Sequence, residues 1–180
     1  MLRQGWRFWR SRDGLAAVEF AFILPVLLVL LCGSIEVTNA LECRQKVISA
    51  TSSISSIVAM TTSVSASDIS NVYAAGNSIL YPFPTNNTAI VISSIVYSSA
   101  TNKDVVQWSV AQNATPLVTN TVMSVPAGVI TATNGDGAIL VQVTHNYTSP
   151  WGHFLVGTFP MGATFWSRPR ESASVACNGC

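Results

Sequence analysis

The feature that most constrains this chain is an apolar run over residues 15–35, in which Glu19 is the only charged residue. A helix rises about 1.5 Å per residue, so a run of this length crosses the roughly 30 Å hydrocarbon core of a bilayer. A carboxylate deep in such a segment costs roughly 2.5–3.5 kcal/mol on insertion scales. We therefore expect a transmembrane helix, and we expect Glu19 to be a functional residue that needs a partner.

The segment before this run, residues 1–14, is basic. It contains the following arginines and aromatic residues: Arg3, Trp6, Arg7, Phe8, Trp9, Arg10 and Arg12. Basic residues are retained on the cytoplasmic side of a membrane, so we expect residues 1–14 inside and the chain after Ile35 outside, with the aromatic rings at the headgroup level. Because the chain has no second basic cluster, membrane lipid is an expected partner and nucleic acid is not.

The remainder of the chain is poor in charge. Charged residues make up 9% of the sequence, against about 25% in an ordinary soluble domain. A surface of serine, threonine and asparagine has little self-repulsion, which favours packing among subunits. A low-charge extracytoplasmic protein without such packing is an equally good interpretation.

The four cysteines divide by location. Cys32 lies in the apolar run and is most simply a small hydrophobic residue, whereas Cys43, Cys177 and Cys180 would lie outside, where disulfides persist. An odd number leaves one thiol free or paired with another chain. Our hypothesis is a structural bridge from the C-terminal pair back to Cys43. The CxxC spacing of Cys177 and Cys180 also fits a redox motif, but it ends the chain without βαβ context.

The apolar spacing after Ile35 predicts that the helix continues to about Thr62, giving one helix of about 45 residues. The predicted apolar stripe comprises Val37, Leu41, Val47, Ile48, Ile54, Ile57 and Val58. Glu42 and Lys46 stand at i and i+4 in the favourable order for a helix pair.

A second, shorter helix is predicted from about Ser65, with Ser67 as its N-cap and Asp68 in its first turn. The apolar positions Ile69, Val72, Ile79 and Leu80 lie largely on one face, and Pro82 and Pro84 end the helix.

Beyond Asn86 the apolar period changes to two. Strands are predicted at 89–98, 104–112 and 137–146, with turns at 102–104 and 134–137 and a short last strand within 171–177. Residues 113–133 and 148–169 read as long irregular segments. The expected fold class is α+β, with a long N-terminal helix packed on a small, mainly antiparallel sheet. The expected organisation is a leader (1–14), a transmembrane helix (15–35), a helical region (36–85) and a β-rich region (86–180).

Catalytic signals are weak. The chain has two histidines, His145 and His153, and contains no HExxH, GxSxG or glycine-rich phosphate loop. The turn from Asn134 to Gly137 lacks the acidic density of a calcium site. We therefore expect no enzymatic activity, no metal and no cofactor, and we expect the histidines to be ordinary surface residues.

The N-terminal pattern resembles the processing site of type IV pilins and pseudopilins: Gly14, four residues, Glu19, the aromatic Phe20 and then the apolar run. Three later segments are similar to TadE/TadG-like minor pseudopilins of tight-adherence (Flp, type IVc) pilus systems. They are Gln107-Trp108-Ser109, residues 141–150, and Arg168-Pro-Arg170 near the terminal cysteine.

The resemblance implies that a prepilin peptidase cuts after Gly14 and leaves Leu15 as the new N-terminus. It also implies assembly through Glu19, which would accept the α-ammonium of a neighbouring subunit, and through Phe20, which stands where major Flp pilins commonly have Tyr. The implied partners are the peptidase, the major pilin, other pseudopilins and an inner-membrane assembly platform. The implied location is the bacterial inner membrane or the pilus.

Other interpretations remain open. The first is an uncleaved single-pass protein whose outer domain binds a ligand or an envelope partner. A secretory signal cut after Ala40 is weaker because Glu36 is poorly placed for it. A lipoprotein site at Cys32 is also weaker, because Leu31 is too large for the position before the acylated cysteine.

Overall fold

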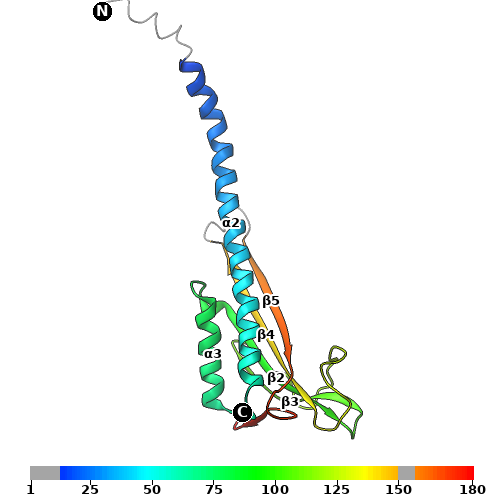
Figure 1. Cartoon of the computed structure of the whole chain (residues 1–180). Helices are drawn as coiled ribbons and strands as arrows, with labels where there is room; N and C mark the ends of the chain where they lie inside the picture. Colours follow the sequence, from blue (N-terminus) through cyan, green and yellow to red (C-terminus); the bar gives the residue numbers. More distant parts are fainter. Residues whose placement is uncertain (1–12, 150–156) are drawn as a thin grey trace, which may run out of the picture.

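The computed structural model describes residues 13–149 and 157–180 (Figure 1). Its elements in chain order are α2 (Asp13–Ala59), β1 (Ser63–Ser65), α3 (Ala66–Leu80), the 3₁₀ turn η1 (Thr85–Asn87), β2 (Thr88–Ser98), β3 (Lys103–Gln112), β4 (Gly137–Thr148), β5 (Thr158–Ser167) and β6 (Ala176–Asn178). The predicted α+β class is confirmed. The arginines and aromatic residues before Asp13, and His153, lie outside the described residues.

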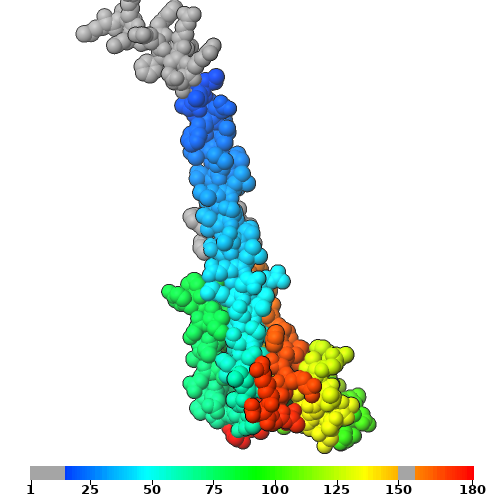
Figure 2. Space-filling model, in the orientation of Figure 1, coloured from blue at the N-terminus to red at the C-terminus, as the bar shows by residue number. Residues whose placement is uncertain are grey.

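Helix α2 is continuous over 47 residues and passes through Pro25 without a break. This confirms the prediction of one helix of about 45 residues. Its first part, residues 15–35, extends away from the sheet and α3, and we call it the apolar half (Figures 1 and 2). This part is long and apolar enough to cross a membrane.

Residues 36–59 of α2, the packed half, lie against the sheet and α3. The buried stripe of this half is Cys43, Val47, Ala50, Ile54 and Val58, at spacings of three and four. The predicted stripe was partly wrong, because Val37, Leu41, Ile48 and Ile57 are exposed. Small and polar residues such as Thr51 and Ser55 share the buried side, so hydrophobicity alone did not identify the covered face.

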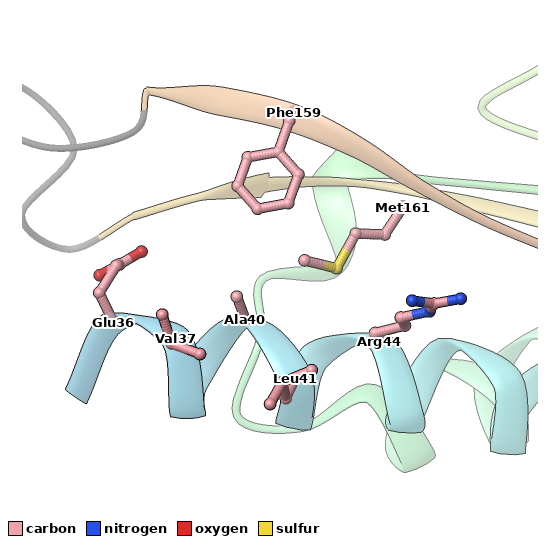
Figure 3. A pocket seen from close by; sticks show the side chains of 7 residues that line it. All are labelled: Glu36, Val37, Ala40, Leu41, Arg44, Phe159 and Met161. Atoms are coloured by element: carbon pink, nitrogen blue, oxygen red, sulfur yellow. The ribbon is translucent and has the colours of Figure 1, made fainter. Parts of the chain in front are cut away.

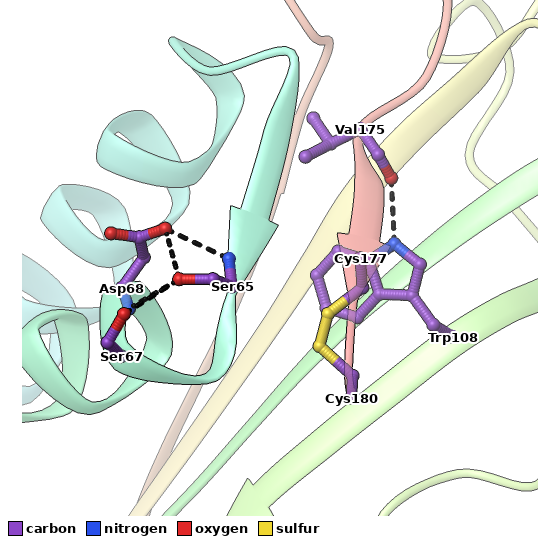
Figure 4. Close-up of a disulfide and its surroundings, with 7 residues drawn as sticks. All are labelled: Ser65, Ser67, Asp68, Trp108, Val175, Cys177 and Cys180. Carbon is purple, nitrogen blue, oxygen red and sulfur yellow. Dashed lines mark hydrogen bonds between the residues drawn. A yellow bond between two sulfur atoms is a disulfide. The ribbon is translucent and has the colours of Figure 1, made fainter.

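Helix α3 is capped by Ser65 and not by the predicted Ser67. The Ser65 N–H donates to Asp68 Oδ2 at 2.9 Å, and the Asp68 N–H donates to Ser65 Oγ at 3.3 Å, which completes a capping box (Figure 4). The hydrogen bonds from Ser65 lower the pKa of the Asp68 carboxyl. The helix ends at Leu80, before Pro82, as predicted.

The main sheet is antiparallel with strand order β3-β2-β4-β5. The three predicted strands form as β2, β3 and β4. The prediction that 148–169 is irregular was wrong, because β5 pairs with β4 over ten residue pairs from Ile139–Ser167 to Thr148–Thr158. Strand β5 carries Pro160 and Gly162, residues that weaken a strand signal but are tolerated on an edge strand.

The C-terminus forms a second, two-stranded sheet in which β6 runs parallel to β1. Trp108 Nε1 donates to the Val175 carbonyl at 2.7 Å and ties this end to β3, while Cys177 and Cys180 form a disulfide (Figure 4). The hypothesised bridge to Cys43 is therefore wrong. Cys43 is a free thiol in the buried stripe of α2, and burial together with the charge of Glu42 raises its pKa to about 11.

Candidate functional site

The predicted processing and assembly residues lie together at the start of α2. Gly14 and Leu15 are in its first turn, and Leu15, Glu19 and Phe20 are all exposed. Within the part of the chain that the structure describes, Glu19 has no hydrogen bond or ion pair. The only carboxylate of the apolar half thus lies on a surface of exposed apolar side chains.

A second carboxylate was missed by sequence reasoning. Glu36 directly follows the apolar half, yet it is 3% exposed and faces the sheet. Tyr147 donates its hydroxyl to Glu36 Oε1 at 3.1 Å, whereas Glu36 Oε2 is buried with no hydrogen-bond partner in the described ranges. Burial, followed by the hydrogen bond to Glu36, raises the pKa of Tyr147 to about 12. The only feature of the sequence that could have pointed to Glu36 as a site residue was its position directly after Ile35, at the end of the apolar run.

Tyr147 packs against two other aromatic rings. Its ring lies 6.0 Å from that of Phe83 and 5.4 Å from that of Phe159, and Phe83 also contacts His145 at 6.2 Å between centroids. The expectation of a surface histidine was wrong for His145, which is buried and hydrogen-bonded through Nδ1 to Thr88 Oγ1 at 2.8 Å. Burial lowers the pKa of His145. This histidine is part of the core.

A groove of about 310 Å³ runs between α2 and β5, with Glu36 at one end and Arg44 at the other (Figure 3). It is lined by Glu36, Val37, Ala40, Leu41, Arg44, Phe159 and Met161. Phe159 and Met161 point from β5 toward the helix because alternate residues of a strand face the same side. A second hollow of about 290 Å³ follows β5 from Phe159 to Gly162.

The described residues contain no group of three or more His, Cys, Asp or Glu side chains that could hold a metal ion. The groove instead offers an apolar lining with one carboxylate and one guanidinium. Such an arrangement can bind a neighbouring helix and can compensate charge on it.

The N-terminal region of the chain is similar to a known protein family. Residues 14–54 match the family described as TadE-like protein. The TadE-like resemblance of the sequence is thereby confirmed over this segment. The matched TadE-like segment contains Gly14, Leu15, Glu19, Phe20 and Glu36, and it indicates involvement in tight-adherence pilus systems. No curated protein and no solved structure matches the chain significantly.

Proposed function

We propose that this TadE-like protein is a structural minor pseudopilin that takes part in the assembly of a tight-adherence pilus. One observation supports the proposal: residues 14–54 are similar to the TadE-like family, and in this segment Glu19 and Phe20 are exposed on an apolar helix that is long enough to span a membrane. The role is non-catalytic.

In this proposal a prepilin peptidase cleaves after Gly14. Helix ends fray, and glycine lacks a Cβ, so this first turn can open and enter a protease as extended chain. Cleavage removes the basic residues 1–14, which otherwise hold the helix at the cytoplasmic face. It also creates an ammonium group on Leu15.

Glu19 then accepts the Leu15 ammonium of a neighbouring subunit. Each charge offsets the desolvation cost of the other, whereas removal of one partner leaves a costly unpaired charge. The pair would also set the register between adjacent helices. The partners in this proposal are the major pilin, other pseudopilins and the inner-membrane assembly platform. The N-terminus is cytoplasmic and the C-terminal domain is extracytoplasmic.

The first test is the N-terminus of the protein purified from its native membrane, determined by intact mass and N-terminal sequencing. A start at Leu15 supports prepilin-type processing. An intact Met1 contradicts it and favours the uncleaved anchor with an outer binding domain. A start at Cys32 or Leu41 contradicts it in favour of a lipoprotein or a secreted protein.

The second test is Glu19→Ala, with Glu42→Ala as a matched control on the same helix. We expect Glu19→Ala to insert into the membrane and to abolish pilus assembly, because the neighbour's ammonium loses its counter-ion. Glu42 is exposed in the packed half, so its variant should assemble pili normally. Normal piliation with Glu19→Ala would refute the assembly role.

A further inference from the structure

The groove between α2 and β5 has opposite charges at its two ends. Glu36 lies next to the apolar half, and Arg44 lies eight residues further along α2, about 12 Å at the rise of a helix. The lining between them, including Ala40, Leu41 and Met161, is apolar. In the described part of the chain, no ion pair joins Glu36 to Arg44.

Glu36 is the unusual group of this groove. Glu36 Oε2 is buried and has no hydrogen-bond partner in the described residues. Such an oxygen loses its hydration without gaining a hydrogen bond, and the free-energy cost is large unless a cation or a donor approaches it. Tyr147 supplies one donor to Oε1 and leaves Oε2 unpaired. Glu36 is one of the residues that line the groove, and within the described residues its Oε2 has neither a cation nor a hydrogen-bond donor.

We propose that this groove receives a lysine or arginine side chain from an apolar helix of a partner membrane protein, with Glu36 as its counter-ion. A long basic side chain suits the groove because its methylene stem packs on apolar residues while its charged end reaches the carboxylate.

The order of the charges indicates that the partner approaches from the membrane side. A cation entering past Arg44 is repelled, whereas one entering at Glu36 comes directly from the end of the apolar half. The exposed side chains of Val37 and Leu41 continue that apolar surface along the groove. The best-matched partner helix carries its basic residue level with Glu36 and an acidic residue about two turns further out, level with Arg44.

This inference needs α2 to span the membrane but needs no cleavage after Gly14 and no role for Glu19. It can therefore fail while the pseudopilin proposal holds, and the reverse is also true. The test accordingly uses the full, uncleaved chain in lipid vesicles without peptidase or other pilus proteins.

Three synthetic single-span helices serve as probes. The first carries Lys at its outer membrane boundary and Glu eight residues further out, the second has these two residues exchanged, and the third has Gln at both positions. A carbodiimide joins a carboxylate directly to an amine in contact with it. Mass spectrometry then measures the amide between Glu36 and the peptide lysine. Energy transfer between labelled peptide and labelled protein measures association.

We expect the first peptide to form the Glu36 amide and to associate at least roughly tenfold more tightly than the exchanged peptide. Its association should weaken roughly tenfold with Glu36→Gln, which keeps an acceptor for Tyr147, and should not change with Glu42→Gln. Equal binding of all three peptides would overturn the inference. Unchanged association of the first peptide with Glu36→Gln, in a variant shown by unfolding to be folded, would also overturn it.

Discussion

The two halves of α2 belong to one unbroken helix but have opposite relations to the rest of the chain. In the apolar half, large side chains such as Leu30 remain 64% exposed. In the packed half, Ile54 is completely buried against α3 and the sheet, although that half contains more serine and threonine. The half richer in hydrophobic residues is thus the one that the chain leaves uncovered.

This contrast shows that the apolar half is not part of the protein's own core. A monomeric soluble protein rarely exposes a large contiguous apolar surface, and this helix is long and apolar enough to cross a membrane. The packed half, in contrast, uses a narrow stripe and small residues, which allow the sheet and α3 to approach closely.

The largest expected difference between the halves comes from truncating one side chain in each. We expect Ile54→Ala to lower the free energy of unfolding of the globular part, residues 36–180, by about 2–5 kcal/mol, because it opens a cavity in a packed core. Leu30→Ala truncates a side chain that is 64% exposed and lies outside the core of the described residues, so it should leave that stability unchanged. Guanidinium unfolding in detergent measures both, and equal effects would contradict the contrast.

The next largest difference in unfolding free energy is expected from substituting one glycine in α3 and one glycine in the apolar half of α2. A Cβ on Gly76 would lie 2.5 Å from Ile54 Cδ1, whereas a Cβ on Gly33 would meet nothing within 4 Å. Overpacking costs about 1–3 kcal/mol and the gain in helix propensity returns about 1, so we expect Gly76→Ala to destabilise by roughly 1 kcal/mol.

Gly33→Ala should not destabilise the globular part at all. The cause of the Gly76→Ala effect is checked by a double-mutant cycle with Ile54→Val, which removes the clashing methyl group. The two changes together should cost less than the sum of each alone. Strict additivity in the unfolding free energies would show that the contact with Ile54 is not responsible.

The next prediction concerns the N-terminal cap of α3, the helix that packs against the packed half of α2. Ser65→Ala removes one side of the capping box and should cost about 1 kcal/mol of the unfolding free energy. Ser67→Ala is the matched control, because the Ser67 hydroxyl, in the described structure, bonds only to the Ser65 hydroxyl, at 2.8 Å. Should Ser67→Ala cost as much as Ser65→Ala, the assignment of the cap would be wrong.

The smallest expected effect is on the exposed surface of the packed half. Lys46 Nζ lies 3.9 Å from Glu42 Oε1, and both side chains are partly or largely exposed, which confirms the predicted i,i+4 pair. Because water and salt screen such a pair, its coupling energy should be about 0.3–0.5 kcal/mol. A double-mutant cycle with Glu42→Gln and Lys46→Gln measures it at low salt, and a coupling above 1 kcal/mol would contradict the prediction.

Much of the fold could be predicted because its signals are local. The continuous helix, the strands β2, β3 and β4 and the end of α3 before Pro82 all follow from spacing within short windows. Strand β5 could not be predicted in this way, since Pro160 and Gly162 obscure its pattern and its partner β4 defines it.

The candidate site divides in the same manner. Gly14, Leu15, Glu19 and Phe20 form a local pattern that needs no fold to be seen. The groove depends on Glu36 meeting Tyr147, which lies 111 residues away, and on β5 lying beside α2. Hydrophobic periodicity in the sequence cannot predict such a long-range contact.

The sequence by itself determined that residues 15–35 form an apolar helix, that one carboxylate stands inside it and that a small β-rich region follows. These are properties of residue order, because helix and strand periods and membrane length are set over neighbouring residues. Only the tertiary structure decided that Glu36 is buried, that Cys177 pairs with Cys180 and not with Cys43, and which face of α2 is covered. Burial and pairing depend on which distant segments meet in space, and those contacts exist only once the chain has folded.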